Sequence, residues 1–149
     1  MSVALPDGYE LREGADPVAA HGYLARSYWA SGIELEVVEK ALANSFAVSV
    51  IKDGAQVAMA RVITDHATFA YLADVYVLET HRGRGLAKAM VAFLLAHPRL
   101  QGLRRWLLST VDAQPLYRQL GWREYPHPER MMTLDNPPAD SPRNVDVHE

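Results

Sequence analysis

The segment from residue 46 to residue 78 most constrains the fold, because it holds three apolar, strand-like stretches joined by very short connections. The stretches FAVSVIK (46–52) and AQVAMARVIT (55–64) flank Asp53 and Gly54, a pair that accepts the positive φ angles of a tight hairpin turn. The third stretch, TFAYLADVYVL (68–78), follows after three residues. The sequence therefore predicts three consecutive antiparallel strands.

Two helices are expected before this meander. A short strand at 8–14 is followed by Asp16 and Pro17, which suit the N-cap and first position of a helix that continues through 18–29. Residues 31–45 repeat apolar side chains at helical spacing opposite a charged face, and Asn44 marks the expected end.

A parallel crossover is expected after the meander. One face of the segment 84–97 is apolar at helical spacing, and Pro98 stops that helix. The later elements are a strand at 103–111, a helix capped by Asp112 with Pro115 in its first turn and Gly121 just beyond it, and one or two strands within 122–134. The predicted fold class is thus a mixed α/β sheet, with antiparallel strands first and one parallel β-α-β crossover at the end.

Composition limits the classes of function. With 149 residues and 49% hydrophobic content, the chain is expected to form one domain over 1–136, with a disordered polar tail at 137–149. There is no cysteine, which excludes disulfides, thiolate metal sites and a catalytic thiol, and the histidines show no metal-site spacing. A net charge of −3 argues against nucleic acid or membrane partners. We expect a cytoplasmic monomer or homodimer without a bound metal.

The stretch HRGRGLAKAM (81–90) places two glycines between a strand and a helix. Backbone N–H groups at such a helix N-terminus favour anions, and Arg82, Arg84 and Lys88 supply charged donors for a phosphate. A Walker loop is absent, because no G-K-[ST] sequence follows. A dinucleotide fingerprint is disfavoured as well, since Lys88 stands where its third glycine is required.

Two motifs resemble the GCN5-related N-acetyltransferase (GNAT) superfamily. Arg82, Gly85 and Ala87 satisfy the pattern [RQ]-x-x-G-x-[GA], which in that family binds the pyrophosphate of acetyl-coenzyme A. In the stretch DAQPLYRQLGW, Tyr117 stands four residues before Gly121, as in a later helix of the family. The resemblance spans residues 8 to about 134 and implies the GNAT fold.

The resemblance also implies roles for individual residues. Tyr117 corresponds to a tyrosine that serves as general acid toward the departing thiolate. The carboxylate that some members carry on the fourth strand corresponds here to Ala73, which cannot act, so the base is either the adjacent Asp74 or a water chain. Asp74 should face away from Ala73 unless a bulge rotates it. The implied cofactor-binding residues are Val75, Tyr76, Val77, Arg82, Gly83, Arg84, Gly85, Leu86, Ala87 and Lys88, and the implied acceptor-binding residues are Tyr28, Trp29, Ile33, Glu34 and Tyr125.

The function implied by the resemblance is transfer of an acetyl group from acetyl-CoA to a primary amine of a small molecule, by direct attack in a ternary complex. Two alternatives stay open: a coenzyme A sensor without turnover, which the missing carboxylate at Ala73 suggests, and an enzyme that modifies protein lysines or N-termini. Purely structural roles are also open for several of these residues. Tyr117, Tyr28 and Trp29 would serve as core aromatics, and Asp74 as a local ion-pair partner.

Overall fold

The computed structural model of the chain describes residues 3–136, and the predicted tail at 137–149 lies outside this range. Its five strands are β1 (Tyr9–Glu13), β2 (Phe46–Lys52), β3 (Ala55–Thr64), β4 (Phe69–Val77) and β5 (Arg105–Leu107). Its helices are α1 (Pro17–Leu24), α2 (Leu35–Ala43), α3 (Leu86–Ala96) and α4 (Gln114–Gln119), with short 3₁₀ turns at Glu79–His81, Pro98–Leu100 and Pro128–Arg130.

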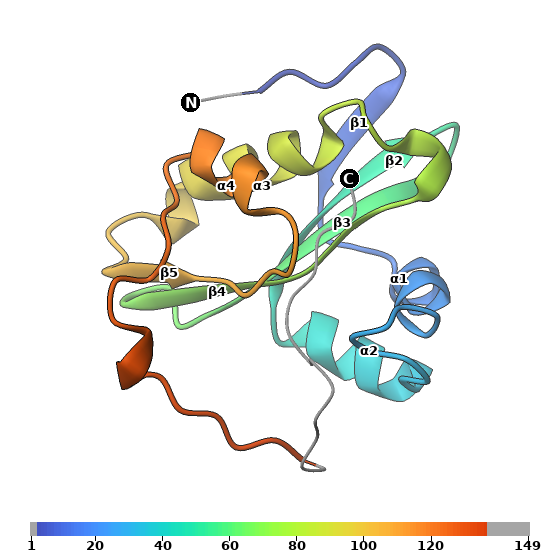
Figure 1. The fold of residues 1–149 in the computed structure, drawn as a ribbon. Coiled ribbons are helices and arrows are strands. Elements are labelled where there is room, and N and C mark those ends of the chain that lie inside the picture. Colours follow the sequence, from blue (N-terminus) through green and yellow to red (C-terminus); the bar gives the residue numbers. More distant parts are fainter. Residues whose placement is uncertain (1–2, 137–149) are drawn as a thin grey trace.

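The strands form one sheet in the order β1-β2-β3-β4-β5 (Figure 1). The first four strands pair antiparallel with their neighbours, and β5 pairs parallel with β4. The predicted fold class is confirmed, including the meander and its single parallel pair. Asp53 and Gly54 both have positive φ angles in the β2–β3 turn, as predicted.

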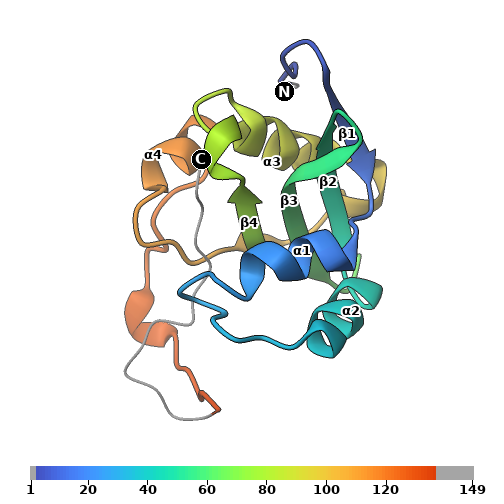
Figure 2. The ribbon, with the colours of Figure 1, turned by 90° about the vertical axis from the view of Figure 1, so that its right-hand side faces the viewer.

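Helices cover both faces of the sheet (Figures 1 and 2). Helices α3 and α4 lie on one face, where Val48, Val62, Leu72, Met90 and Leu94 belong to a large apolar core. Helices α1 and α2 lie on the other face over a smaller aromatic core. Alternation along the strands supplies both cores, because successive side chains of a strand point to opposite faces.

Helix α1 begins as predicted but ends earlier. The Asp16 side chain accepts a hydrogen bond from the backbone N–H of Val18, and Pro17 occupies the first turn. The helix ends at Leu24 instead of continuing to residue 29. Ser27 supplies the reason, because its hydroxyl donates to the carbonyl of Leu24 at 2.7 Å and accepts from the N–H of Ala30. Such local side-chain bonds compete with helix propagation.

Predictions for the C-terminal third were partly wrong. Strand β5 covers three residues rather than the whole of 103–111, and the N-cap of α4 is Ala113 rather than Asp112. The described residues after α4 contain no strand, only the 3₁₀ turn at 128–130. Pro126 and Pro128 lack backbone N–H donors, which weakens any strand ladder in that segment.

Among residues 3–136, no helix has the length and apolar character that a membrane span needs.

Candidate functional site

Strands β4 and β5 separate soon after they pair. Only Phe69–Tyr71 of β4 pairs with β5, so the rest of β4 as far as Val77 has no partner from β5. On its other side β4 continues to pair with β3. The N–H of Leu78 donates to the carbonyl of Val57, and since backbone direction alternates along a strand, the backbone groups of Val77 point toward the open edge.

The glycine loop lies between this open strand end and α3. Gly83 and Gly85 both have φ of +77°, and a Cβ atom added to either would meet no other atom within 4 Å. Gly85 is the N-cap of α3 and provides no side-chain bond to the first turn. The N–H groups of Leu86, Ala87 and Lys88 at the positive end of this 11-residue helix have no intrahelical acceptor, and Leu86 and Ala87 are buried residues. This geometry fits a diphosphate, although the binding role stays a prediction.

The basic side chains of the loop differ in their contacts. Arg82 was predicted to reach phosphate oxygens, but its Nε donates to the carbonyl of Val77 at 3.0 Å and its Nη2 donates to the hydroxyl of Tyr23 at 3.2 Å. It thus joins the open end of β4 to α1. Lys88 donates to the side-chain oxygen of Gln119 on α4 at 3.0 Å. Arg84 is exposed to solvent at the tip of the loop.

A β-bulge in β4 determines where Asp74 points. Arg61 pairs with Ala73 and Met59 pairs with Tyr76, so Ala60 of β3 lies opposite two residues of β4. Asp74 has a φ of +53°, in the left-handed region. Val75 and Val77 consequently face the α3 side, while the Asp74 side chain and Tyr76 face the α1–α2 side. The bulge anticipated as an exception is present, and it moves Asp74 from the apolar core to the opposite face.

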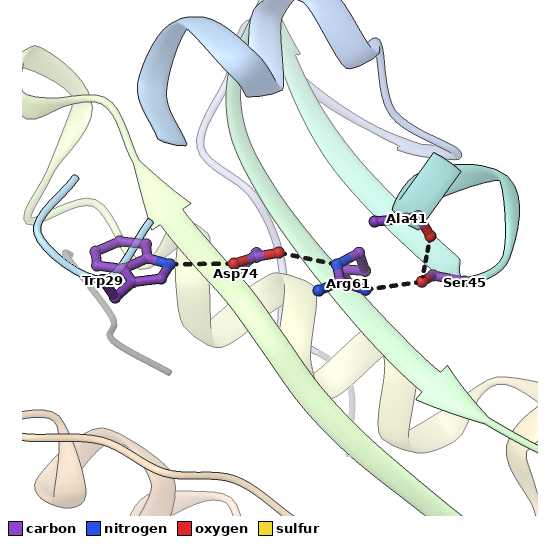
Figure 3. Close-up of polar contacts among 5 residues, drawn as sticks. All are labelled: Trp29, Ala41, Ser45, Arg61 and Asp74. Carbon is purple, nitrogen blue, oxygen red and sulfur yellow. Dashed lines mark hydrogen bonds and ion pairs between the residues drawn. The ribbon is translucent and has the colours of Figure 1, made fainter. Parts of the chain in front are cut away.

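Both carboxylate oxygens of Asp74 accept hydrogen bonds (Figure 3). The indole Nε1 of Trp29 donates to Oδ1 at 3.1 Å, and Nε of Arg61 donates to Oδ2 at 2.9 Å. Nη1 of Arg61 donates in turn to Oγ of Ser45 at 3.0 Å, and Ser45 donates to the carbonyl of Ala41. The Arg61 and Asp74 side chains are 15% and 16% exposed, so this ion pair is only partly solvated. The contacts support the local-pairing role for Asp74, and its role as a base stays a prediction.

Tyr117 is almost fully buried, at 2% exposure. It belongs to the same large apolar core as Val75, Val77 and Leu86. Its ring lies 5.7 Å from that of Trp122. The packing role is evident in these contacts, and the role as general acid stays a prediction.

The five predicted acceptor residues do not form one cluster. Trp29 is 9% exposed, and Tyr28, at 49%, contacts it edge-on at 5.5 Å. Ile33 packs against the same aromatic core, whereas Glu34 is exposed at the N-cap of α2. Tyr125 lies elsewhere, beneath the guanidinium of Arg105, and lines a cavity of about 810 Å³ between β5, α4 and residues 121–130.

Four residues near the site were missed in the sequence. Arg61 donates to Asp74 and also to Ser45. Tyr23 accepts from Arg82, and its ring stacks on that of Tyr76 with centroids 4.3 Å apart. Burial and the charge of Asp74 raise the pKa of Tyr71, which lies where β4 and β5 part. No spacing signal distinguished these residues from ordinary strand and helix positions.

Burial raises the pKa of Tyr76 to about 12, partly offset by a hydrogen bond from Gln56. Its phenol therefore stays neutral on the α1–α2 face.

Within residues 3–136 no three histidine, aspartate or glutamate side chains gather closely enough to hold a metal ion.

Comparison with known proteins gives a consistent picture. A model of the acetyltransferase (GNAT) family matches residues 9–122. A crystal structure from Xanthomonas campestris pv. campestris, described as an acetyltransferase of the GNAT family, is 40% identical. It superposes with a TM-score of 0.79, and the match covers 89% of this chain and 95% of that chain.

Of two further matches, one covers only part of each chain and the other has a lower sequence identity. A Gibberella zeae protein named as an acetyltransferase is 42% identical over 79 residues, which is 50% of this chain and 44% of that protein, so the match spans less than half of its length. A Clostridium acetobutylicum structure, described as an acetyltransferase with acetyl-CoA, is 17% identical with a TM-score of 0.65 and covers 85% of this chain and 96% of its own. At that identity the likeness concerns the fold.

Proposed function

This chain belongs to the GNAT acetyltransferase family, and on that premise we propose that it transfers an acetyl group from acetyl-CoA to a primary amine by direct attack in a ternary complex. The single observation that carries the proposal is the open edge of β4 beside the glycine loop of α3. Pairing with β5 stops at Tyr71, and Gly83 and Gly85 lead directly into the first turn of α3, whose N–H groups have no intrahelical acceptor.

The residues of the loop fit the diphosphate of a coenzyme A ester. A diphosphate needs several N–H donors around a space that side chains leave free. Gly83 and Gly85 have no side chain and adopt positive φ angles, so they leave such a space in the loop. Arg84 adds an exposed positive charge at the rim. Arg82 has an indirect role, because it keeps the end of β4 next to the loop through Val77.

The open edge of β4 at Val77 is the place for the thioester arm, since the N–H of Val77 points outward there and an extended chain would continue the sheet by backbone hydrogen bonding. Tyr76 pairs with Met59 of β3, and the Val77 carbonyl accepts from Arg82. When bound, acetyl-CoA supplies an activated acyl group. Tyr117, in the same core as Val75 and Val77, is our candidate for the proton donor to the leaving thiolate.

The amine must lose a proton before or during attack. We assign this step to water at the open edge of β4, because both oxygens of Asp74 already accept bonds from Trp29 and Arg61. A free amine has a pKa of about 10.4 if it resembles lysine, so the rate should rise with pH in the neutral range.

A continuous assay of thiol release tests the proposal. Purified protein is mixed with acetyl-CoA and a panel of arylalkyl amines, polyamines, amino acids and a lysine peptide, and the acetylated product is identified by mass. We expect amine-dependent release of coenzyme A with at least one small amine. Tight binding of acetyl-CoA with no turnover across the panel would instead favour the sensor, and failure to bind coenzyme A in any form would refute both.

A further inference from the structure

The outer edge of β5 has no strand beside it within residues 3–136, although a large cavity lies there. Strand β5 is the last in the order of the sheet, and its three residues pair only with β4. All three line the cavity of about 810 Å³ that α4 and residues 121–130 enclose, and no residue of β4 lines it. The cavity therefore follows the edge that faces away from β4. Such an edge presents unpaired backbone N–H and C=O groups that can pair with another strand.

A strand-like segment of the same chain is left uncovered. Residues 131–134 follow the 3₁₀ turn at Pro128–Arg130, and Met131 has extended backbone, with φ of −98° and ψ of 135°. Met132 and Leu134 are each 96% exposed, and Met131 is 50% exposed. Figures 1 and 2 show that the segment leads away from the sheet after the turn, so the chain does not fill its own cavity.

We propose that residues 131–134 of a second copy of this chain occupy the cavity and add a strand to the outer edge of β5, each copy giving its segment to the other. One two-fold contact then covers both free edges and both exposed segments. Because the exchange is reciprocal, it closes at a dimer instead of growing into a fibre. The exchange does not depend on the proposed acetyl transfer.

The side chains of the segment match those of the cavity. Successive residues of a strand point to opposite faces, so Met132 and Leu134 share one face and Thr133 lies on the other. Pairing would remove from water the two most exposed large apolar side chains of residues 3–136. Five apolar side chains that line the cavity are only partly buried at the margin of the large core: Leu95, Trp106, Leu108, Leu120 and Trp122.

The charges of the cavity and of the incoming chain are complementary. Among the lining residues a single carboxylate, that of Glu124, accompanies five arginines: Arg104, Arg105, Arg118, Arg123 and Arg130. The sequence after Leu134 holds one arginine, Arg143, and four acidic residues: Asp135, Asp140, Asp146 and Glu149. An acidic chain is therefore brought to a basic edge, which favours encounter of the two copies.

The hinge favours a second copy over the chain's own segment. Only residues 126–130 separate the cavity wall at Tyr125 from the segment, and two of them are prolines. This hinge holds no glycine or asparagine for the tight turn that pairing within one chain would require. Short, stiff hinges favour exchange between copies.

Sedimentation velocity of the full chain tests the assembly. We expect a dimer whose fraction rises with protein concentration. The double variant Met132→Glu with Leu134→Glu should weaken dimerisation by about tenfold or more, because charges on a strand oppose its pairing. Val18→Glu with Val37→Glu is the matched control, since both valines are exposed on α1 and α2, and it should leave dimerisation unchanged.

A second measurement distinguishes exchange from pairing within one chain. Isotope-labelled and unlabelled chains are unfolded in urea, mixed in equal amounts and refolded together. In isotope-filtered NOE spectra we expect contacts between copies, from the methyl group of Met132 to those of Leu108 and Leu120. Contacts confined to single chains would place the segment in its own cavity and overturn the proposal.

Hydrogen exchange in wild type decides the matter even if the double variant fails to fold. The amides of β5 that point to its outer edge should exchange about tenfold or more slowly in concentrated than in dilute protein. Exchange that is independent of concentration, a chain that stays monomeric, or a dimer that survives Met132→Glu with Leu134→Glu would each overturn the proposal. None of these results would affect the proposed acetyl transfer.

Discussion

The guanidinium of Arg82 donates a hydrogen bond from Nε to the carbonyl oxygen of Val77, 3.0 Å away. This bond satisfies a carbonyl at the open end of β4, five residues before the arginine in the sequence. The motif arginine is therefore a brace for the strand that leads into the loop, and its second bond, to the hydroxyl of Tyr23, extends the brace to α1.

Replacing Arg82 should reduce stability. Hydrogen bonds from a charged group to buried acceptors contribute about 1.5–3 kcal/mol each, so we expect Arg82→Met to lower the free energy of unfolding by about 2 kcal/mol. Urea denaturation measures this change. Arg84→Met is the matched control, since Arg84 is exposed in the same loop. It should leave stability unchanged while weakening coenzyme A binding in a salt-dependent way. Equal stability of both variants would contradict the bracing role.

A side chain at Gly85 should abolish coenzyme A binding. We expect Gly85→Glu to remove detectable binding in calorimetric titrations, because the carboxylate would stand in front of the N–H groups of α3 that are proposed to hold the diphosphate. Gly54→Glu is the control, as Gly54 has a similar φ of +79° in the turn between β2 and β3. It imposes a comparable backbone strain of about 1–2 kcal/mol without touching the site. Near-normal affinity in Gly85→Glu would refute the cradle.

Removing the hydroxyl of Tyr117 should affect the rate and little else. If the phenol protonates the leaving thiolate, Tyr117→Phe should lower kcat by about 10²-fold or more, with the dissociation constant for acetyl-CoA nearly unchanged. Steady-state kinetics and calorimetry separate the two quantities. Trp122→Phe perturbs the neighbouring ring without removing the hydroxyl and should keep most of the activity. Parallel losses in rate and affinity in Tyr117→Phe would assign the residue to packing alone.

Alkaline pH should destabilise the fold through Tyr76. Burial raises its pKa from the ordinary tyrosine value of about 10 to about 12, so the folded state keeps the proton after the unfolded state has lost it. The stabilisation is complete below pH 10 and is lost as the pH rises from 10 to 12, by about 2–3 kcal/mol. Comparing urea unfolding of wild type and Tyr76→Phe across this range isolates the effect from lysine titration. The variant should show a shallower decline, and identical slopes would show that Tyr76 does not contribute.

Local patterns in the sequence predicted the elements that are stabilised locally. The Asp53-Gly54 turn, the cap at Asp16 and the apolar stripe of α3 each depend on residues within a few positions of one another. The predicted end of α1 was wrong because a single side chain, Ser27, bonds to the carbonyl of Leu24 and ends the helix there. The missing strand after α4 belongs to the same class of error, because pairing is decided by a partner edge and not by composition.

By itself, the sequence determined the order of strands and helices as far as α4, the glycine loop before α3 and the motifs that resemble the GNAT family, because these follow from periodicity, turn chemistry and short spacings. Only the tertiary structure decided that β4 bulges at Asp74, that it leaves β5 after Tyr71, and that Trp29 meets Asp74 across 45 residues. The physical reason is that strand register and long-range side-chain contacts result from packing two faces of one sheet at once. A one-residue bulge, invisible in the sequence pattern, turned a carboxylate from the core toward the proposed acceptor side.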